Sequence, residues 1–168
     1  QRMDRMRDAF AVTPSYLQTQ ETQPVRNLMD TGVQLGRRFR ALKLWMVLRH
    51  FGADGMRRRL AEHIRLAALF ASWVDDSEMF ERLAPVPFSV VCFRARPLQS
   101  DHDETALDDL NVQVLDGVNA TGEVFLSHTR LDGRFALRLA VGHIRTTERH
   151  VARAWTLLGE QLATHLQA

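Results

Sequence analysis

The 168-residue sequence has one cysteine, one lysine and one tyrosine, and these scarcities exclude several kinds of site. A lone cysteine, Cys92, excludes an internal disulfide and a thiolate metal cluster. Its place inside the apolar run 88–93 predicts a buried, unreactive thiol. Lys43 is the only lysine, so almost all of the positive charge comes from arginine.

The sequence also lacks a long hydrophobic run and a strong charge of one sign. No apolar stretch approaches the ~20 residues that a membrane helix needs, and no charged-then-apolar signal segment opens the chain, so we expect a cytoplasmic protein with no membrane partner. The formal net charge is +2, and basic residues are spread along the chain beside acids, apart from short runs such as 37–38 and 57–59, with no basic stripe with aromatic platforms. This pattern predicts no nucleic-acid partner.

Motifs for metal-dependent and nucleophilic hydrolysis are missing too. The seven histidines do not cluster, and none of them has the spacing of an HExxH zinc motif. No Gly-x-Ser-x-Gly elbow and no phosphate-cradling glycine loop is present. We therefore predict no metal site.

The first 35 residues differ from the rest of the chain. They contain a polar Gln/Thr run and Pro24, with no sustained helical or strand period. Such a stretch is typical of a functional loop, a lid or a linker. From Arg38 the apolar spacing becomes helical, and it predicts one helix that ends at Gly52 and a second over 54–74.

The remainder predicts short strands mixed with helices. Strands are expected over 79–83 and 88–94, a helix over 105–118, and a hairpin of strands 123–129 and 134–141 joined by an Asp-Gly turn. A last helix follows Thr147 as its N-cap. Because hairpins and one long crossover connect the strands, we expect an α+β domain with a mostly antiparallel sheet covered by helices.

Two places have the chemistry of a site. Tyr16 lies on the polar N-terminal stretch after Pro14, where a tyrosine is either a proton donor or an ordinary surface residue. Leu35 and Gly36 precede Arg37 and Arg38 at the start of a helix. Free backbone N–H groups beside two arginines suit a phosphate, although short segments of this kind are frequent.

A long string of residues resembles a known family. It begins with Leu-Gly-Arg-Arg-Phe-Arg-Ala-Leu-Lys-Leu-Trp at 35–45, followed by Val-Leu-Arg-His-Phe-Gly at 47–52. Further matches are Thr-Pro-Ser-Tyr-Leu at 13–17, Glu-His-Ile-Arg-Leu-Ala at 62–67, Val-Cys-Phe-Arg at 91–94 and His-Val-Ala-Arg-Ala-Trp at 150–155. Over nearly its whole length the chain resembles the group II pyridoxal-phosphate decarboxylases, the family of aromatic L-amino-acid decarboxylase.

The resemblance implies an architecture and a domain division. The fold of that family is the aspartate-aminotransferase type, fold type I, with a large cofactor domain followed by a small C-terminal domain. Residues 1–35 then correspond to the end of the cofactor domain with its mobile catalytic loop, 36–75 to connecting helices, and 76–168 to the small α+β domain.

The resemblance also implies an activity and roles for three residues. The parent enzyme is expected to be a homodimeric lyase of amino-acid metabolism that uses pyridoxal 5'-phosphate to convert an L-amino acid, favoured to be aromatic, into an amine and carbon dioxide. Tyr16 matches the catalytic-loop tyrosine that protonates the substrate carbon after decarboxylation, where aldehyde-forming members tend to have phenylalanine. Leu35 and Gly36 match a segment that reaches the partner subunit's cofactor phosphate and substrate pocket.

The family's Schiff-base lysine has no counterpart here, because Lys43 matches a helix lysine instead. We therefore expect the chain to act only with the remainder of its own cofactor domain and a dimer partner, and to be inactive alone. The alternative is a stand-alone α+β dimerisation or binding module derived from such an enzyme.

Overall fold

The structure is a computed structural model that describes Arg5, Ala9, residues 39–97 and residues 103–166. The three predicted site residues, Tyr16, Leu35 and Gly36, lie outside these described residues. The chain divides into two units, Gln1–Gly52 and Ala53–Ala168.

Helix α2 (Arg40–Asp75) contains the two helices expected from the sequence. Its helical geometry is interrupted at Gly52, where φ is +66° and ψ is 173°. A side chain at this φ would be strained, so glycine is the residue that permits the interruption. Residues 40–51 belong to the first unit, and residues 53–75 belong to the second.

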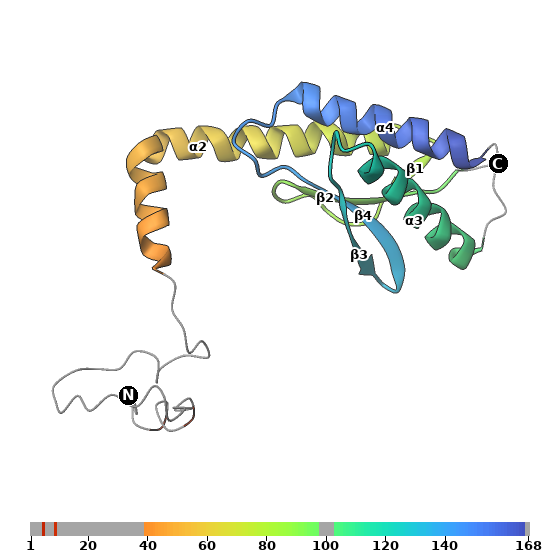
Figure 1. Ribbon diagram of the computed structural model, residues 1–168, viewed down its shortest axis with the longest axis horizontal. Helices are drawn as coiled ribbons and strands as arrows, with labels where there is room; N and C mark the ends of the chain where they lie inside the picture. The colour runs from red at the N-terminus through yellow and green to blue at the C-terminus, as the bar shows by residue number, and fades with distance from the viewer. Residues whose placement is uncertain (1–4, 6–8, 10–38, 98–102, 167–168) are drawn as a thin grey trace. The chain divides into compact units, whose positions relative to one another are not determined.

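The second unit is built on a four-stranded sheet (Figure 1). Its strands are β1 (Phe80–Arg82), β2 (Val90–Ala95), β3 (Ser127–Leu131) and β4 (Arg134–Ala140). They pair in the order β1-β2-β4-β3, and every pairing is antiparallel. The β3–β4 hairpin turns through Asp132 and Gly133, which have φ of 50° and 81°. Two positive φ angles are what a tight hairpin turn requires, so the Asp-Gly prediction is confirmed.

One face of the sheet faces the core. The alternation predicted for β4 is confirmed, since Phe135, Leu137, Leu139 and the following Val141 are all buried. Helix α4 (Glu148–Leu166) and the second part of α2 lie over this face. Phe70 of α2 joins the layers, with its ring centroid 5.1 Å from that of Phe93 on β2 and 5.6 Å from that of Trp155 on α4. The expected helix-covered antiparallel sheet is therefore present.

Two expectations need correction. Cys92 is half-buried instead of buried, because strand alternation sends Val91 and Phe93 into the core and Cys92 to the opposite face. The strand expected over 123–129 begins only at Ser127. The backbone of the preceding residue, Leu126, is bonded on both its N–H and its C=O by the side chain of Asn119, at 2.8 and 3.0 Å.

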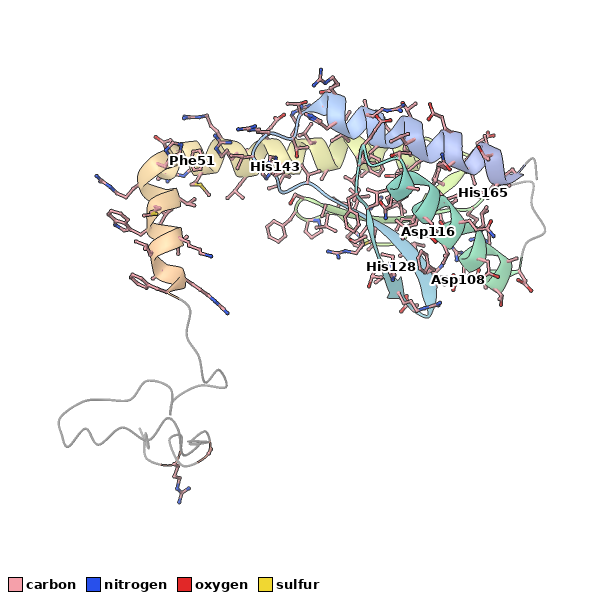
Figure 2. All side chains as sticks on the ribbon, viewed as in Figure 1. Phe51, Asp108, Asp116, His128, His143 and His165 are labelled. Atoms are coloured by element: carbon pink, nitrogen blue, oxygen red, sulfur yellow. The ribbon has the colours of Figure 1, made fainter. Side chains whose placement is uncertain are left out.

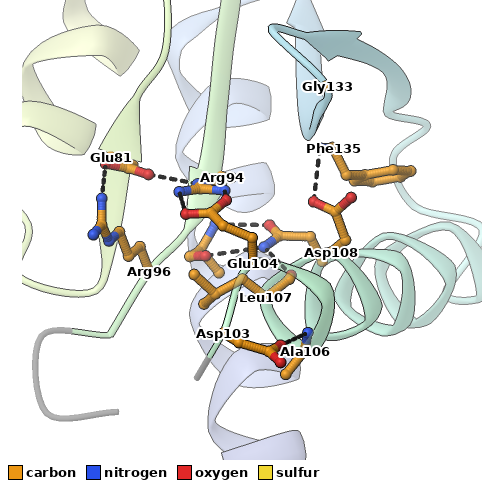
Figure 3. A network of polar contacts seen from close by, with 12 residues as sticks. Glu81, Arg94, Arg96, Asp103, Glu104, Ala106, Leu107, Asp108, Gly133 and Phe135 are labelled. Atoms are coloured by element: carbon orange, nitrogen blue, oxygen red, sulfur yellow. Dashed lines mark hydrogen bonds and ion pairs between the residues drawn. The ribbon is translucent and has the colours of Figure 1, made fainter. Parts of the chain in front are cut away.

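Helix α3 (Glu104–Ala120) is hydrogen-bonded to the sheet at the point where β2 and β4 stop pairing. The pairing of β2 with β4 ends at Phe93 and Leu137, and the same register would continue to Ala95 opposite Phe135, a pair that is absent. The Asn111 side chain instead accepts the N–H of Ala95 at 2.7 Å and donates to its C=O at 2.9 Å (Figure 3). The Asp108 carboxylate accepts the N–H of Phe135 at 2.8 Å. Side chains of α3 thus replace a missing strand pair.

Helix α4 begins directly after its predicted N-cap, and α3 begins one residue before the predicted helix. The Asp103 carboxylate accepts the Ala106 N–H at 2.8 Å and caps α3. Thr147 precedes α4, and its carbonyl accepts the N–H groups of His150 and Val151. The Thr147 N–H in turn donates to Nδ1 of His150 at 3.1 Å, so the first turn of α4 is closed from both directions.

Replacing Asn111, whose amide bonds both backbone groups of Ala95, is the strictest test of this arrangement. Asn111 is fully buried, and Asn111→Ala leaves the N–H and C=O of Ala95 without partners in the interior. We expect the free energy of unfolding to fall by about 3 kcal/mol, since each unsatisfied buried group costs about 1–3 kcal/mol. Urea denaturation of the chain measures it. The exposed Gln113→Ala on the same helix is the control and should change stability by less than about 0.5 kcal/mol. Equal effects of the two substitutions would show that the hydrogen bonds between Asn111 and Ala95 do not stabilise the fold.

Candidate functional site

The described residues do not include the candidate site that the sequence predicts. Tyr16, Leu35 and Gly36 remain predictions, and the structure does not bring them together or apart. What it shows instead are the charged clusters, hollows and surfaces of the residues that would support such a site.

Lys43 is the only lysine and so the only side chain that could hold an aldehyde cofactor as a Schiff base. It lies on the first part of α2, where it is exposed to solvent. A Schiff-base lysine needs a pocket that orients the cofactor and excludes water. Lys43 does not line either of the two hollows of about 510 and 560 Å³ that are formed by described residues. The described residues therefore do not fit a covalent cofactor centre.

The largest buried polar side chain is the guanidinium of Arg94 on β2, which is fully enclosed. Its Nε donates to Glu81 on β1, and its two terminal nitrogens donate to Glu104 on α3 at 2.7 and 3.2 Å (Figure 3). Arg96 donates to the second oxygen of Glu81 at 3.1 Å. One arginine therefore ties the edge strand, the neighbouring strand and the start of α3 together.

The charges of this cluster are mutually satisfied. The hydrogen bond from Arg94 holds the pKa of Glu104 below its ordinary value, and the bond to Glu104 is the largest cause that raises the pKa of Arg94. Groups held in their charged forms at neutral pH do not exchange protons with a substrate. The cluster is thus a structural joint and not an acid–base centre.

A hollow of about 510 Å³ lies where β4 ends and α4 begins. Its floor is apolar and buried, and the imidazoles of His143 and His150 stand on its exposed rim together with Arg145 (His143 is labelled in Figure 2). Nδ1 of His143 accepts the N–H of Arg145 at 3.2 Å, and Nδ1 of His150 accepts from Thr147. Each imidazole therefore supports a local turn.

A second hollow, of about 560 Å³, lies between β1 and α4 and is mostly apolar, with Met79, Phe80, Trp155 and Leu162 on its walls. Within the described ranges, no group of three or more His, Cys, Asp or Glu side chains is arranged to hold a metal ion. None of the helices in the described part of the chain is long and apolar enough to cross a membrane.

The sequence places Arg94 in a run of residues that resembles the family, but it does not predict that Arg94 joins two strands to α3. The available signal was an arginine inside an otherwise apolar strand, since a buried arginine requires acidic partners. Its partners, Glu81 and Glu104, come from other elements. Periodicity along one element does not identify them.

Comparison with known proteins places the chain among relatives of one kind. The sequence pattern described as "Pyridoxal-dependent decarboxylase conserved domain" matches residues 2–96. Tryptophan decarboxylase 2 of Oryza sativa subsp. japonica is 44% identical over 155 residues, which cover 91% of this chain and 31% of that protein. Phenylacetaldehyde synthase of Arabidopsis thaliana is 38% identical over 160 residues, covering 94% of this chain and 32% of its own length.

A solved structure gives the same result. A crystal structure described as Oryza sativa TDC with PLP and tryptamine matches with a TM-score of 0.76 and 32% identity, covering 97% of this chain and 34% of that one. This chain therefore spans about a third of the length of the relatives that it matches.

The Arg94 cluster makes a prediction about acid stability. Because the folded-state pKa of Glu104 lies below its ordinary value of 4.5, ionised Glu104 stabilises the fold above that pH, and the contribution is lost as pH falls through the folded pKa. Glu104→Gln should therefore be less stable than the unaltered chain near neutral pH, and the difference should shrink below pH 4.5. Urea unfolding across this pH range measures it. Glu78→Gln, which removes an exposed acid outside the cluster, is the control, and the same profile for both variants would contradict the assignment.

Proposed function

The chain belongs to the pyridoxal-dependent decarboxylase family, and on that premise we propose that it is the C-terminal part of a lyase that converts an aromatic L-amino acid into an amine and carbon dioxide. The 44% identity over 91% of the chain with a tryptophan decarboxylase carries this proposal. Because the chain spans about a third of such relatives, the parent polypeptide contributes the other two thirds. We assign residues 1–35 to the end of its cofactor domain, 36–75 to connecting helices and 76–168 to its small domain.

Pyridoxal phosphate is the proposed cofactor of the parent enzyme. When bound, it supplies an electron sink for the charge left by decarboxylation. The one lysine of the chain is exposed and lines no described hollow, so we assign the covalent lysine to the remainder of the parent polypeptide. The chain by itself is then a support without a reaction centre.

Three residues outside the described ranges carry the proposed site roles. Tyr16 is assigned to protonate the substrate carbon, because a phenol on a polar loop is a suitable proton donor and the family resemblance aligns it with the catalytic-loop tyrosine. Leu35 and Gly36 are assigned to the cofactor phosphate and substrate pocket of the partner subunit. Arg37 and Arg38 follow them, and guanidinium groups suit a phosphate.

A second copy of the parent is the proposed partner of the first part of α2. The large apolar side chains of residues 39–48 are all exposed, from 37% for Val47 to 73% for Phe39. They occupy most of the helix circumference, with Arg40 and Lys43 on the remainder, and a helix that is apolar on most sides is typically buried in a complete protein. Homodimerisation would cover it beside the partner's pocket. We place this dimer in the cytoplasm, in line with the single unpaired cysteine.

The first test asks whether the chain can hold the cofactor. After incubation of the 168-residue chain with pyridoxal phosphate and reduction with borohydride, intact-mass measurement should show no specific adduct at Lys43, and no carbon dioxide should form from tryptophan, tyrosine or phenylalanine. The full-length parent treated in the same way should carry one adduct and release carbon dioxide. A stoichiometric adduct at Lys43, or a parent without any decarboxylase activity, would overturn the proposal.

The second test separates decarboxylation from aldehyde formation, the activity named for one relative. Tyr16→Phe in the full-length parent should lower amine output by about 100-fold or more, the usual contribution of a positioned proton donor, and should raise the aldehyde fraction. Product analysis by mass spectrometry measures both. Thr19→Val, on the same polar stretch, is the control. Unchanged amine output in Tyr16→Phe would remove Tyr16 from the site, and aldehyde as the main product of the unaltered parent would favour the alternative activity.

A further inference from the structure

The hollow between the end of β4 and the start of α4 has the size and the lining of a small-molecule site. Its volume is about 510 Å³, within the range of about 300–1,000 Å³ that is common for such sites. The floor is made of buried apolar side chains, those of Leu126, Leu139, Val141, Val151 and Ala154. Phe125 also lines the hollow, although its side chain is 83% exposed.

The rim of this hollow carries two imidazoles whose hydrogens can be placed from their backbone partners. Nδ1 of His143 lies 3.2 Å from the backbone nitrogen of Arg145, and Nδ1 of His150 lies 3.1 Å from that of Thr147. A backbone N–H can only donate, so each Nδ1 is an acceptor without a hydrogen. The neutral imidazoles therefore carry their hydrogens on Nε2. Neither Nε2 is bonded to a described residue, so each is a donor available to a ligand.

The charged side chains of the hollow also leave donors available. Arg145 is exposed and forms no ion pair with a described residue. Among the described residues that line the hollow, Glu123 is the only acid, and both of its carboxylate oxygens accept from Arg153 at 2.7 Å. The hydroxyl of Thr146 can donate as well as accept. The rim thus combines one guanidinium and two imidazole donors with no available carboxylate.

Hydrogen bonds from two helices hold the rim segment 143–147 in place. Arg59 of α2 donates to the carbonyl of Ile144 at 3.2 Å, and His150 of α4 accepts the N–H of Thr147. Within the segment, the N–H of Thr146 donates to the carbonyl of His143 at 3.0 Å. Donors that are positioned before a ligand arrives reduce the cost of ordering the site on binding.

The excess of donors decides between two kinds of occupant. A segment of protein would bring its own backbone N–H groups into a rim that already has donors without acceptors. A small carboxylic acid brings acceptors alone when it is ionised, and its two oxygens match a guanidinium and an imidazole N–H. Its apolar part would cover the floor of the hollow. An aromatic amine has no acceptor for these donors and is excluded.

We propose that this hollow is a binding site for a small carboxylic acid with an aromatic body. Arg145, His143 and His150 hold the carboxylate at the rim, and the ring lies on the apolar floor beside Phe125. The site uses none of the residues that are assigned to the reaction. It therefore stands whether or not the parent polypeptide is a decarboxylase.

Titration with phenylacetate tests the site directly. Backbone-amide NMR spectra of the 168-residue chain should show one saturable site around residues 143–147, with a Kd of about 1 mM or below, which ligands of this small size commonly reach. Phenethyl alcohol and phenethylamine have the same ring without the carboxylate, and acetate has the carboxylate without the ring. Each should bind at least about tenfold more weakly. Equal affinity of phenylacetate and any of these three would overturn the proposal.

Two pairs of exposed variants test the named residues without disturbing the core. Arg145→Gln should weaken phenylacetate binding at least about fivefold. Arg149→Gln removes the same charge from the first turn of α4, outside the hollow, and should leave the affinity unchanged. Phe125→Ala should weaken binding about threefold or more, whereas Phe88→Ala removes a phenylalanine that is 71% exposed elsewhere and should have no effect. Equal losses within either pair would contradict the assignment.

The hydrogen positions can be measured as well. Long-range proton–nitrogen correlation spectra at about pH 8, where histidines are mostly neutral, distinguish the two imidazole tautomers. His143 and His150 should both be Nε2–H forms, and phenylacetate should shift their Nε2 signals. An Nδ1–H form of either histidine would remove it from the site and overturn the proposal.

The full-length parent shows whether the hollow is open in the whole protein. The parent should bind one more equivalent of phenylacetate than its Arg145→Gln variant does, and this difference excludes binding elsewhere in the parent. Equal stoichiometry would mean that the hollow is covered there, and it would overturn the proposal. A parent that shows the difference but does not decarboxylate supports the site and refutes the proposed function, and a decarboxylating parent without the difference does the reverse.

Discussion

The bond pattern between Asn111 and Ala95 is the constraint on which the second unit depends. At this point β2 and β4 stop pairing, and an asparagine amide takes the place of the missing strand. An amide can do this because it offers one donor and one acceptor in the same geometry as a peptide group. Asp108 repeats the device for the N–H of Phe135, and Asn119 repeats it for Leu126. Three side chains of one helix thereby fix where the strands end.

Because α3 is fixed in this way, the Arg94 joint can form. Glu104 is held on the first turn of α3, one turn before Asp108, and it meets the guanidinium that Glu81 already holds. Arg94 can be buried because Glu81 and Glu104 both form ion pairs with its guanidinium. The edge strand β1, with three residues, gains from this joint a connection that its few ladder bonds do not supply.

The parts of the fold that the sequence predicted are those determined by neighbours along the chain. The alternation of Phe135, Leu137 and Leu139 and the Asp-Gly turn follow from local sterics, and both are confirmed. The start of β3 and the partners of Arg94 depend on residues from other elements, which no local period encodes. The candidate site was predictable only through the family resemblance, since Tyr16, Leu35 and Gly36 have no local pattern that separates them from ordinary loop residues.

The described surface of the second unit and the first part of α2 differ in how their side chains are paired. On the outside of the second unit, Arg65 pairs with Glu62 and Glu148, and Arg153 pairs with Glu123, so these two arginines have their charges balanced internally. The first part of α2 differs, because it presents the exposed side chains of Trp45 and Leu44. Among the described residues, this contrast supports the proposal that another protein surface covers the first part of α2.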